Sequence, residues 1–113
     1  MESYPKHIKK QLRHLADLLY ERELNEALSR LDTYFAEWRE QKISPFLLSK
    51  KIHEFHQGEA RELYGKYVTS PFLDLLVANG IVLGKLKNAE ISPEVWDVVQ
   101  QMVKKYEAQS EEE

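Results

Sequence analysis

The stretch that decides the fold is residues 6–41, which read KHIKKQLRHLADLLYERELNEALSRLDTYFAEWREQ. Apolar side chains recur in it at steps of three and four residues, the spacing of one stripe along a helix. One step of five, from Leu19 to Leu24, breaks the phase, and Tyr20 restores it. The pattern predicts an unbroken helix with a stutter, or else a short bend near Tyr20. The stripe consists of Ile8, Leu12, Leu15, Leu19, Leu24, Leu28, Leu31, Phe35 and Trp38.

The length of this helix sets it apart from the rest of the chain. About 36 residues at about 1.5 Å per residue give about 54 Å. A compact domain of 113 residues has a diameter of only about 35 Å, taken from a radius of gyration near 13 Å. A helix that overhangs its own domain either bends or pairs with a second chain. We therefore expect a protein partner, and a second copy of this chain (a dimer) is the simplest one.

Four prolines divide the chain into segments: Pro5, Pro45, Pro71 and Pro93. Each of the last three directly follows a serine, whose hydroxyl accepts a hydrogen bond from an otherwise unpaired backbone N–H at a helix start. Proline suits the next position, because its missing N–H costs nothing there and its φ is already helical. We predict a helix start near each proline. The fold class is all-α, with a long N-terminal helix packed with three or four shorter helices.

The segment that begins at Pro45 contains Gly58, where two outcomes are open. If the helix ran on unchanged, Glu59 would fall inside its apolar stripe and lie partly buried beside His56. If the helix ended at Gly58, Glu59 would begin a new turn at the surface. We favour the break, because glycine is the residue most often found just past a helix C-terminus.

The segment after Pro71 is apolar nearly all round, which predicts a central, buried helix. An alternative is a turn at Asn79-Gly80 followed by a short strand over residues 81–83. The last helix, from Pro93, has apolar residues at steps of three and four, and from Ala108 the composition turns to Gln, Ser and Glu. We predict a single helical domain over residues 1–107 and a frayed acidic tail over 108–113.

Composition excludes several classes of site. The chain has no cysteine, which removes disulfides, thiolate metal sites and cysteine nucleophiles. Four glycines and four prolines are too few for a turn-dense β-sandwich or barrel. The polar, basic N-terminus predicts no signal peptide, and no apolar run is long enough for a membrane span. We expect a cytoplasmic protein without a cofactor, and we find no candidate catalytic residue.

One group of side chains could bind a metal ion. His53 and His56 are three residues apart, so on a helix they lie about 60° apart, and Glu59 follows after three more. Three nitrogen and oxygen ligands with an open position are typical of catalytic zinc and related sites. The spacing is not the H-E-x-x-H of zincins. The plainer interpretation is that His56 packs at the edge of the core and His53 faces water.

A second candidate site is the basic cluster Lys6, Lys9, Lys10 and Arg13. Such a cluster could contact phosphates, although a solvated helix face near the chain end explains it as well. The net charge of −3 and the isoelectric point near 5.8 are not those of a general nucleic-acid binder. We rank a nucleic-acid-binding or regulatory adaptor below a metal-dependent enzyme or metal-binding protein, and both below self-association without catalysis.

The block over residues 52–64, I-H-E-F-H-x-G-x-A-R-E-L-Y, resembles a core shared by a group of small bacterial helical proteins. Residues 21–24, E-R-E-L, and the pair Phe35-x-x-Trp38 are similar to the long first helix of that group. The resemblance covers residues 20–85. No activity is attached to the group, so the resemblance assigns no site residue. It implies a bacterial, cytoplasmic helical protein.

Overall fold

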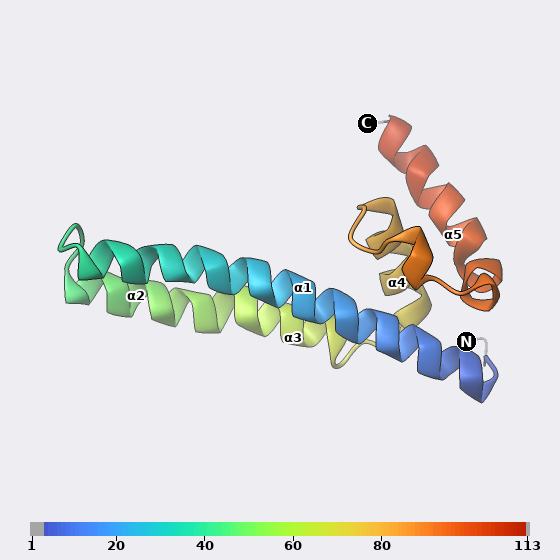
Figure 1. Ribbon diagram of the computed structural model, residues 1–113, viewed down its shortest axis with the longest axis horizontal. Coiled ribbons are helices and arrows are strands. Elements are labelled where there is room, and N and C mark those ends of the chain that lie inside the picture. Colours follow the sequence, from blue (N-terminus) through green and yellow to red (C-terminus); the bar gives the residue numbers. More distant parts are fainter. Residues whose placement is uncertain (1–3, 113) are drawn as a thin grey trace. The chain divides into compact units, whose positions relative to one another are not determined.

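The computed structural model describes the backbone of residues 4–112 and the side chains of residues 4–109, and this part of the chain is all-α, without a strand. The long N-terminal helix and the shorter helices after it confirm the predicted fold class (Figure 1). The helices are α1 (Lys6–Arg39), α2 (Pro45–Phe55), the π-helix η1 (His56–Ala60), α3 (Arg61–Tyr67), α4 (Leu73–Val82), the 3-10 helix η2 (Asn88–Glu90) and α5 (Pro93–Glu112).

Prolines do mark the helix starts. Helices α2 and α5 begin at their prolines, each after a serine cap. The Ser44 hydroxyl accepts a hydrogen bond from the Leu47 backbone N–H at 3.1 Å, and the Ser92 hydroxyl accepts one from the Val95 N–H at 3.2 Å. Helix α4 begins at Leu73, two residues after its proline.

Helix α1 is continuous through Tyr20, so the phase break in its apolar stripe is a stutter and not a bend. Its 34 residues span about 51 Å at about 1.5 Å per residue. The helix ends at Arg39, two residues earlier than predicted. Gln41 ends the helical path, because its φ of 62° lies in the left-handed region.

The predicted break at Gly58 is wrong. Helices α2, η1 and α3 follow one another without a gap, and the residues at the ends of η1 keep right-handed helical dihedrals. A π-turn holds one extra residue, which turns everything after it back by about 100° relative to a uniform α-helix. This rotation carries Glu59 off the apolar stripe and brings Tyr67 into line with Leu48. Tyr67 and Leu48 are 2% and 6% exposed.

The chain forms two compact units: one comprises Met1–Leu19 and Ser70–Glu113, and the other comprises Tyr20–Thr69. Helix α1 thus gives its first half to the first unit and its second half to the second. The single domain predicted over residues 1–107 and the tail over 108–113 stay predictions. Helix α5 itself continues to Glu112, and residue 113 lies outside the described residues.

The first unit has a closed apolar core between α1, α4 and α5. Helices α1 and α4 approach closely at Gly80, where an added Cβ would lie 2.7 Å from the Cδ atoms of Leu19. The buried apolar residues of this unit are Ile8, Leu12, Leu15, Ala16, Leu19, Val77, Ala78, Leu86, Val95, Val99 and Val103.

Helix α4 only partly matches its prediction. It runs as a helix to Val82, so the alternative strand over residues 81–83 is wrong. Its inner side is buried, but its outer side is not: Phe72, Leu75 and Leu83 are 51%, 38% and 56% exposed. The prediction of a fully buried helix therefore fails on the outer side, where the described part of this unit supplies no covering layer.

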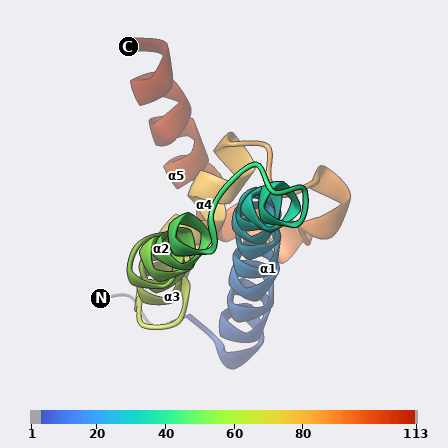
Figure 2. The ribbon, with the colours of Figure 1, turned by 90° about the vertical axis from the view of Figure 1, so that its left-hand side faces the viewer.

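The second unit is a helical hairpin. The second half of α1 runs antiparallel to the rod formed by α2, η1 and α3, and both views show the two side by side (Figures 1 and 2). Contacts along the hairpin pair Tyr20 with Tyr67 at one end and Tyr34 with Lys51 towards the loop. This hairpin carries the candidate site described next.

Candidate interaction surface

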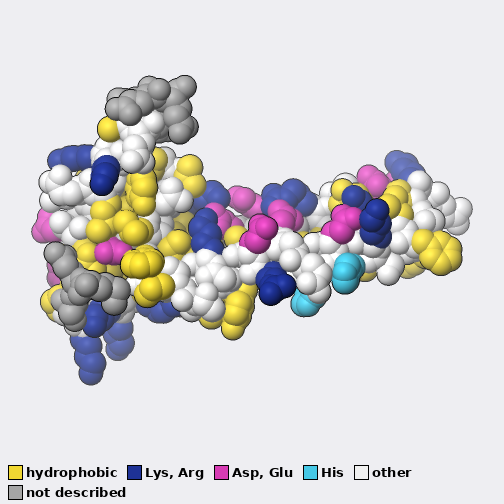
Figure 3. Space-filling model, turned by 180° about the vertical axis from the view of Figure 1, so that it is seen from behind, with side chains coloured by type: hydrophobic (Ala, Val, Ile, Leu, Met, Phe, Trp, Pro, Cys, Tyr) yellow, Lys and Arg dark blue, Asp and Glu magenta, His cyan; other side chains and the backbone are white. Residues whose placement is uncertain are grey.

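One face of the hairpin carries charge pairs across the seam between its helices. The Arg30 guanidinium pairs with the Glu59 carboxylate. Lys51 lies with its Nζ 3.6 Å from Glu54 Oε2 and 5.1 Å from the centre of the Tyr34 ring. Together with Leu31 and Phe55, these side chains line an open groove of about 270 Å³. Acidic and basic side chains gather along the hairpin in Figure 3.

The same polar face contains a buried carboxylate near the open end of the hairpin. Glu23 is 8% exposed, and Lys66 Nζ lies 3.4 Å from both of its oxygens. The Tyr67 ring stacks on Tyr20 with the ring centres 5.7 Å apart. Burial raises the pKa of the Tyr67 phenol above its ordinary value, and a hydrogen bond to Glu23 and the charge of Glu23 add to this. The cluster therefore favours a protonated Tyr67 and ties α1 to α3 in one register.

The opposite face of α1 is apolar. Counting about 100° per residue, Ala27 and Tyr34 lie on the line that faces the other helix, and Arg30 lies on the polar side of that line. Leu24, Leu28 and Phe35 fall on the other side. Leu28 is 45% exposed, so this second stripe is not covered by the hairpin itself.

The rod of α2, η1 and α3 has the same division. Lys51 and Glu59 lie on its polar side, in the contacts given above. Ile52, Tyr64 and Val68 lie on the opposite side once the extra residue of η1 is counted. Because the two helices meet with their polar sides on one face, their apolar sides also share a face.

We call this surface the hairpin apolar face, and its members from the rod are largely exposed. Ile52, Tyr64 and Val68 are 40%, 54% and 43% exposed. Contiguous exposed apolar side chains on a protein surface are typical of interaction sites. The hairpin apolar face consists of Leu24, Leu28, Phe35, Ile52, Tyr64 and Val68.

The predicted metal ligands are not brought together. His53 and His56 are exposed on the rod, towards the apolar side, whereas Glu59 lies on the polar side in its pair with Arg30. Among the described residues, no group of three or more potential ligands is placed to hold a metal ion. The metal site over His53, His56 and Glu59 stays a prediction, and this arrangement gives it no added support.

The basic cluster at the start of α1 is split by its contacts within the first unit. Lys6, Lys9 and Lys10 are exposed. Arg13 Nε instead lies 3.3 Å from the Asp17 carboxylate, one turn further along the same helix. Phosphate binding by this cluster stays a prediction.

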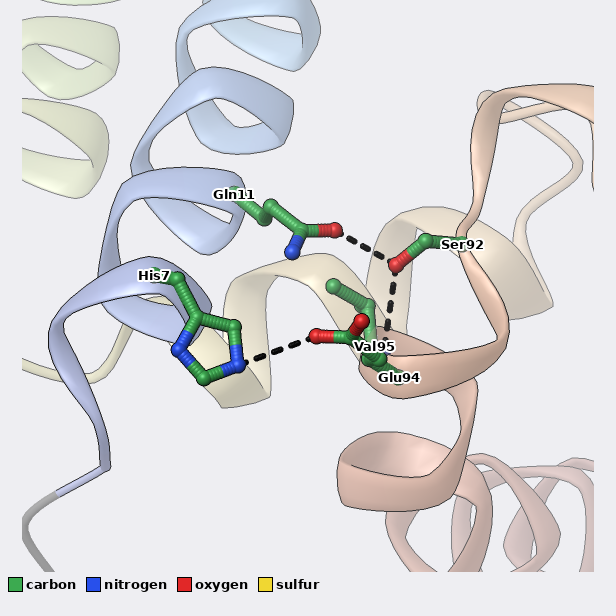
Figure 4. Close-up of polar contacts among 5 residues, drawn as sticks. All are labelled: His7, Gln11, Ser92, Glu94 and Val95. Carbon is green, nitrogen blue, oxygen red and sulfur yellow. Dashed lines mark hydrogen bonds and ion pairs between the residues drawn. The ribbon is translucent and has the colours of Figure 1, made fainter.

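The first turns of α1 are also tied to the start of α5 (Figure 4). His7 Nε2 lies 3.0 Å from a Glu94 carboxylate oxygen, and the Ser92 hydroxyl donates to the Gln11 side-chain oxygen. The cap of α5 therefore has a second role, because the same hydroxyl joins two helices of the first unit.

Sequence reasoning missed the hairpin apolar face because it treated the apolar positions of α1 as one stripe and did not predict which part of that stripe stays exposed. Leu24, Leu28 and Phe35 continue the periodicity of the buried residues before them, so periodicity alone does not separate the two groups. Tyr64 and Val68 were hidden by the extra residue of η1. A helical projection that includes a π-turn at Gly58, in place of a uniform α-helix, would have predicted their position.

No helix in the described part of the chain combines the length and apolar character needed to cross a bilayer. Comparison with protein-family models, with curated proteins and with solved structures found no match to this chain.

Proposed function

We propose that this protein acts by protein–protein interaction, without catalysis, and that its partner is a second copy of the same chain. The observation that carries the proposal is the hairpin apolar face, which is exposed opposite the face that carries the charge pairs. The lack of cysteine supports a reducing, cytoplasmic location as part of the proposal.

The physical reason for self-association is the small core of a two-helix layer. Among the described residues of the hairpin, the buried ones are Glu23, Ala27, Leu48 and Tyr67, and one of these is a carboxylate. Two hairpins stacked by their apolar faces make a four-helix bundle, in which each helix has two apolar neighbours. Such a pairing also accounts for the length of α1, whose second half then has a partner along its exposed stripe.

The test is sedimentation equilibrium over a range of protein concentrations. We expect the wild-type chain to dimerise, and we expect Leu28→Glu and Ile52→Glu to shift it to monomer, because each places a charge in the apolar contact. Ser29→Glu is the matched control, since it adds the same charge to an exposed position of α1 outside the hairpin apolar face. A strictly monomeric wild-type chain, or equal effects of Ser29→Glu and Leu28→Glu, would contradict the proposal.

The two alternative functions have separate tests. A metal-binding role requires bound metal in elemental analysis of the purified protein, or a rise in melting temperature with added zinc that His56→Ala removes. A nucleic-acid role requires binding that weakens steeply with salt and is lost on replacing Lys9 and Lys10. No contact among the described residues supports either alternative function.

A further inference from the structure

We propose that the two copies pair in one particular way, with α1 of each copy lying against the α2–α3 rod of the other. In this arrangement Asp32 of one copy faces His56 and Arg61 of the second copy. The inference rests on the proposed self-association and adds the geometry and the residues that select the partner surface.

The first observation is the charge along the two outer edges of the hairpin apolar face. Counting about 100° per residue, the edge on α1 carries Glu21 and Asp32, with Arg39 at its loop end. The edge on the rod carries His53, His56 and Arg61 instead, all of them exposed. Histidine side chains lie along one edge of the hairpin in Figure 3. The α1 edge is therefore acidic before Arg39, and the rod edge is basic at Arg61 and carries no carboxylate.

The second observation is that the two fixed charges at these edges are available. Within the described part of the chain, neither Asp32 nor Arg61 takes part in an ion pair or side-chain hydrogen bond. On the opposite, polar face Arg30 is paired with Glu59 and Lys66 with Glu23, while Glu26 is exposed and has no ion pair among the described residues. Asp32 and Arg61 are thus unpaired charges that border the hairpin apolar face.

Symmetry leaves two ways to stack two hairpins face to face. A two-fold axis parallel to the helices places α1 over the rod of the other copy, and an axis across the helices places α1 over α1. The first arrangement sets the acidic edge against the basic edge. The second sets the α1 edge against the α1 edge and the rod edge against the rod edge, which leaves Arg61 without a carboxylate on the edge opposite it. Charge complementarity selects partners and fixes their register, and it favours the first arrangement.

The level of the residues along the hairpin agrees with this choice. Asp32 lies between Arg30 and Tyr34, whose contacts on the rod, Glu59 and Lys51, lie on either side of His56. Rotation about an axis parallel to the helices does not shift levels along them. Asp32 of one copy therefore comes level with His56 of the second copy, within reach of Arg61.

A charge exchange tests the arrangement. We expect Asp32→Arg and Arg61→Glu each to raise the dimer dissociation constant about tenfold, because like charges then meet twice in the symmetric dimer. The double variant with both changes should return to within about threefold of the wild-type constant, since the pair is restored with reversed signs. Glu26→Arg is the matched control, because Glu26 is exposed on the polar side of α1, and we expect no change from it.

The measurement is sedimentation equilibrium at low salt, with circular dichroism to show that each variant keeps its helical content. If neither single variant weakens the wild-type dimer, or if the double variant is weaker than both, the arrangement is wrong while self-association stands. If the wild-type chain does not associate at all, the proposed function itself fails.

Discussion

The two halves of α1 belong to one helix and share one apolar periodicity, yet they end up in different surroundings. In the first half, Ile8, Leu12, Leu15, Ala16 and Leu19 are all buried. In the second half, among the described residues, only Glu23 and Ala27 are buried. The difference comes from the number of neighbours, because the first half packs with α4 and α5 and the second half packs with a single helical rod.

The comparison shows how a regular pattern can serve two purposes. Three helices enclose a core, so the apolar stripe in the first unit is buried against other helices of the same chain. Two helices enclose only a seam, so the second stripe of the hairpin is left for another molecule. Charge pairs such as Lys66 with Glu23 lie on the polar face of the hairpin. The exposed apolar stripe therefore lies on the opposite face.

The largest expected effect separates the two halves directly. Leu12→Ala removes a buried side chain of the first unit and should lower the free energy of unfolding by about 2–5 kcal/mol. Leu28→Ala, on the half-exposed stripe of the hairpin, should cost less than about 1 kcal/mol in dilute monomer. Urea denaturation at micromolar concentration measures both. Equal decreases in unfolding free energy would mean that the hairpin stripe is buried in the monomer, and would contradict the difference between the two halves of α1.

The second prediction concerns the buried polar cluster that replaces an apolar core in the hairpin. Tyr67→Phe removes the phenol that hydrogen-bonds to the Glu23 carboxylate, and it should cost about 1.5–3 kcal/mol at pH 7, the usual range for a bond to a charged group. Urea denaturation of the two chains gives this difference. Tyr20→Phe is the control, because the Tyr20 ring stacks on Tyr67 and its hydroxyl has no hydrogen bond among the described residues.

The pKa of Tyr67 gives this cluster a pH dependence with a defined sign. Because the folded pKa is raised, the contribution of the phenol is complete below the ordinary tyrosine pKa of about 10 and falls as pH rises through the folded value. The stability difference between wild type and Tyr67→Phe should therefore shrink above about pH 10. A difference that grows between pH 7 and pH 10.5 would contradict the assignment.

Two glycines give the third and smaller test, with opposite signs in the two units. Gly80→Ala should destabilise the protein by about 1–3 kcal/mol, because the new Cβ overlaps the buried Leu19 side chain. Gly58→Ala has open space around it and should stabilise the hairpin by about 0.5–1 kcal/mol, since glycine is unfavourable inside a helix. Thermal unfolding measures both. Destabilisation by Gly58→Ala would show that the π-turn needs glycine.

Much of the fold could be predicted from local chemistry. The serine–proline pairs at Ser44 and Ser92 predict the starts of α2 and α5, because capping depends only on the adjacent backbone. The break at Gly58 was wrong because glycine permits a helix end without requiring one. Packing of Tyr67 against Tyr20 instead stabilises a continuous helical rod that holds one extra residue in η1.

Less of the candidate site could be predicted. The sequence placed Glu59 near His56 as a possible metal ligand, but the partner of Glu59 is Arg30, which is distant in the chain. Ion pairs across a hairpin depend on the register of two helices, and the register depends on every contact along the seam. A single-helix projection therefore cannot assign such a carboxylate.

Periodicity and capping are enough to predict that the chain is helical and where most of its helices begin, because both act within a few residues. Tertiary structure decided which part of the apolar stripe is covered, because coverage depends on how many helices surround each half of α1. It also decided that Gly58 lies inside a helical rod. The hairpin apolar face follows from both decisions, since the π-turn sets the side on which Tyr64 and Val68 lie.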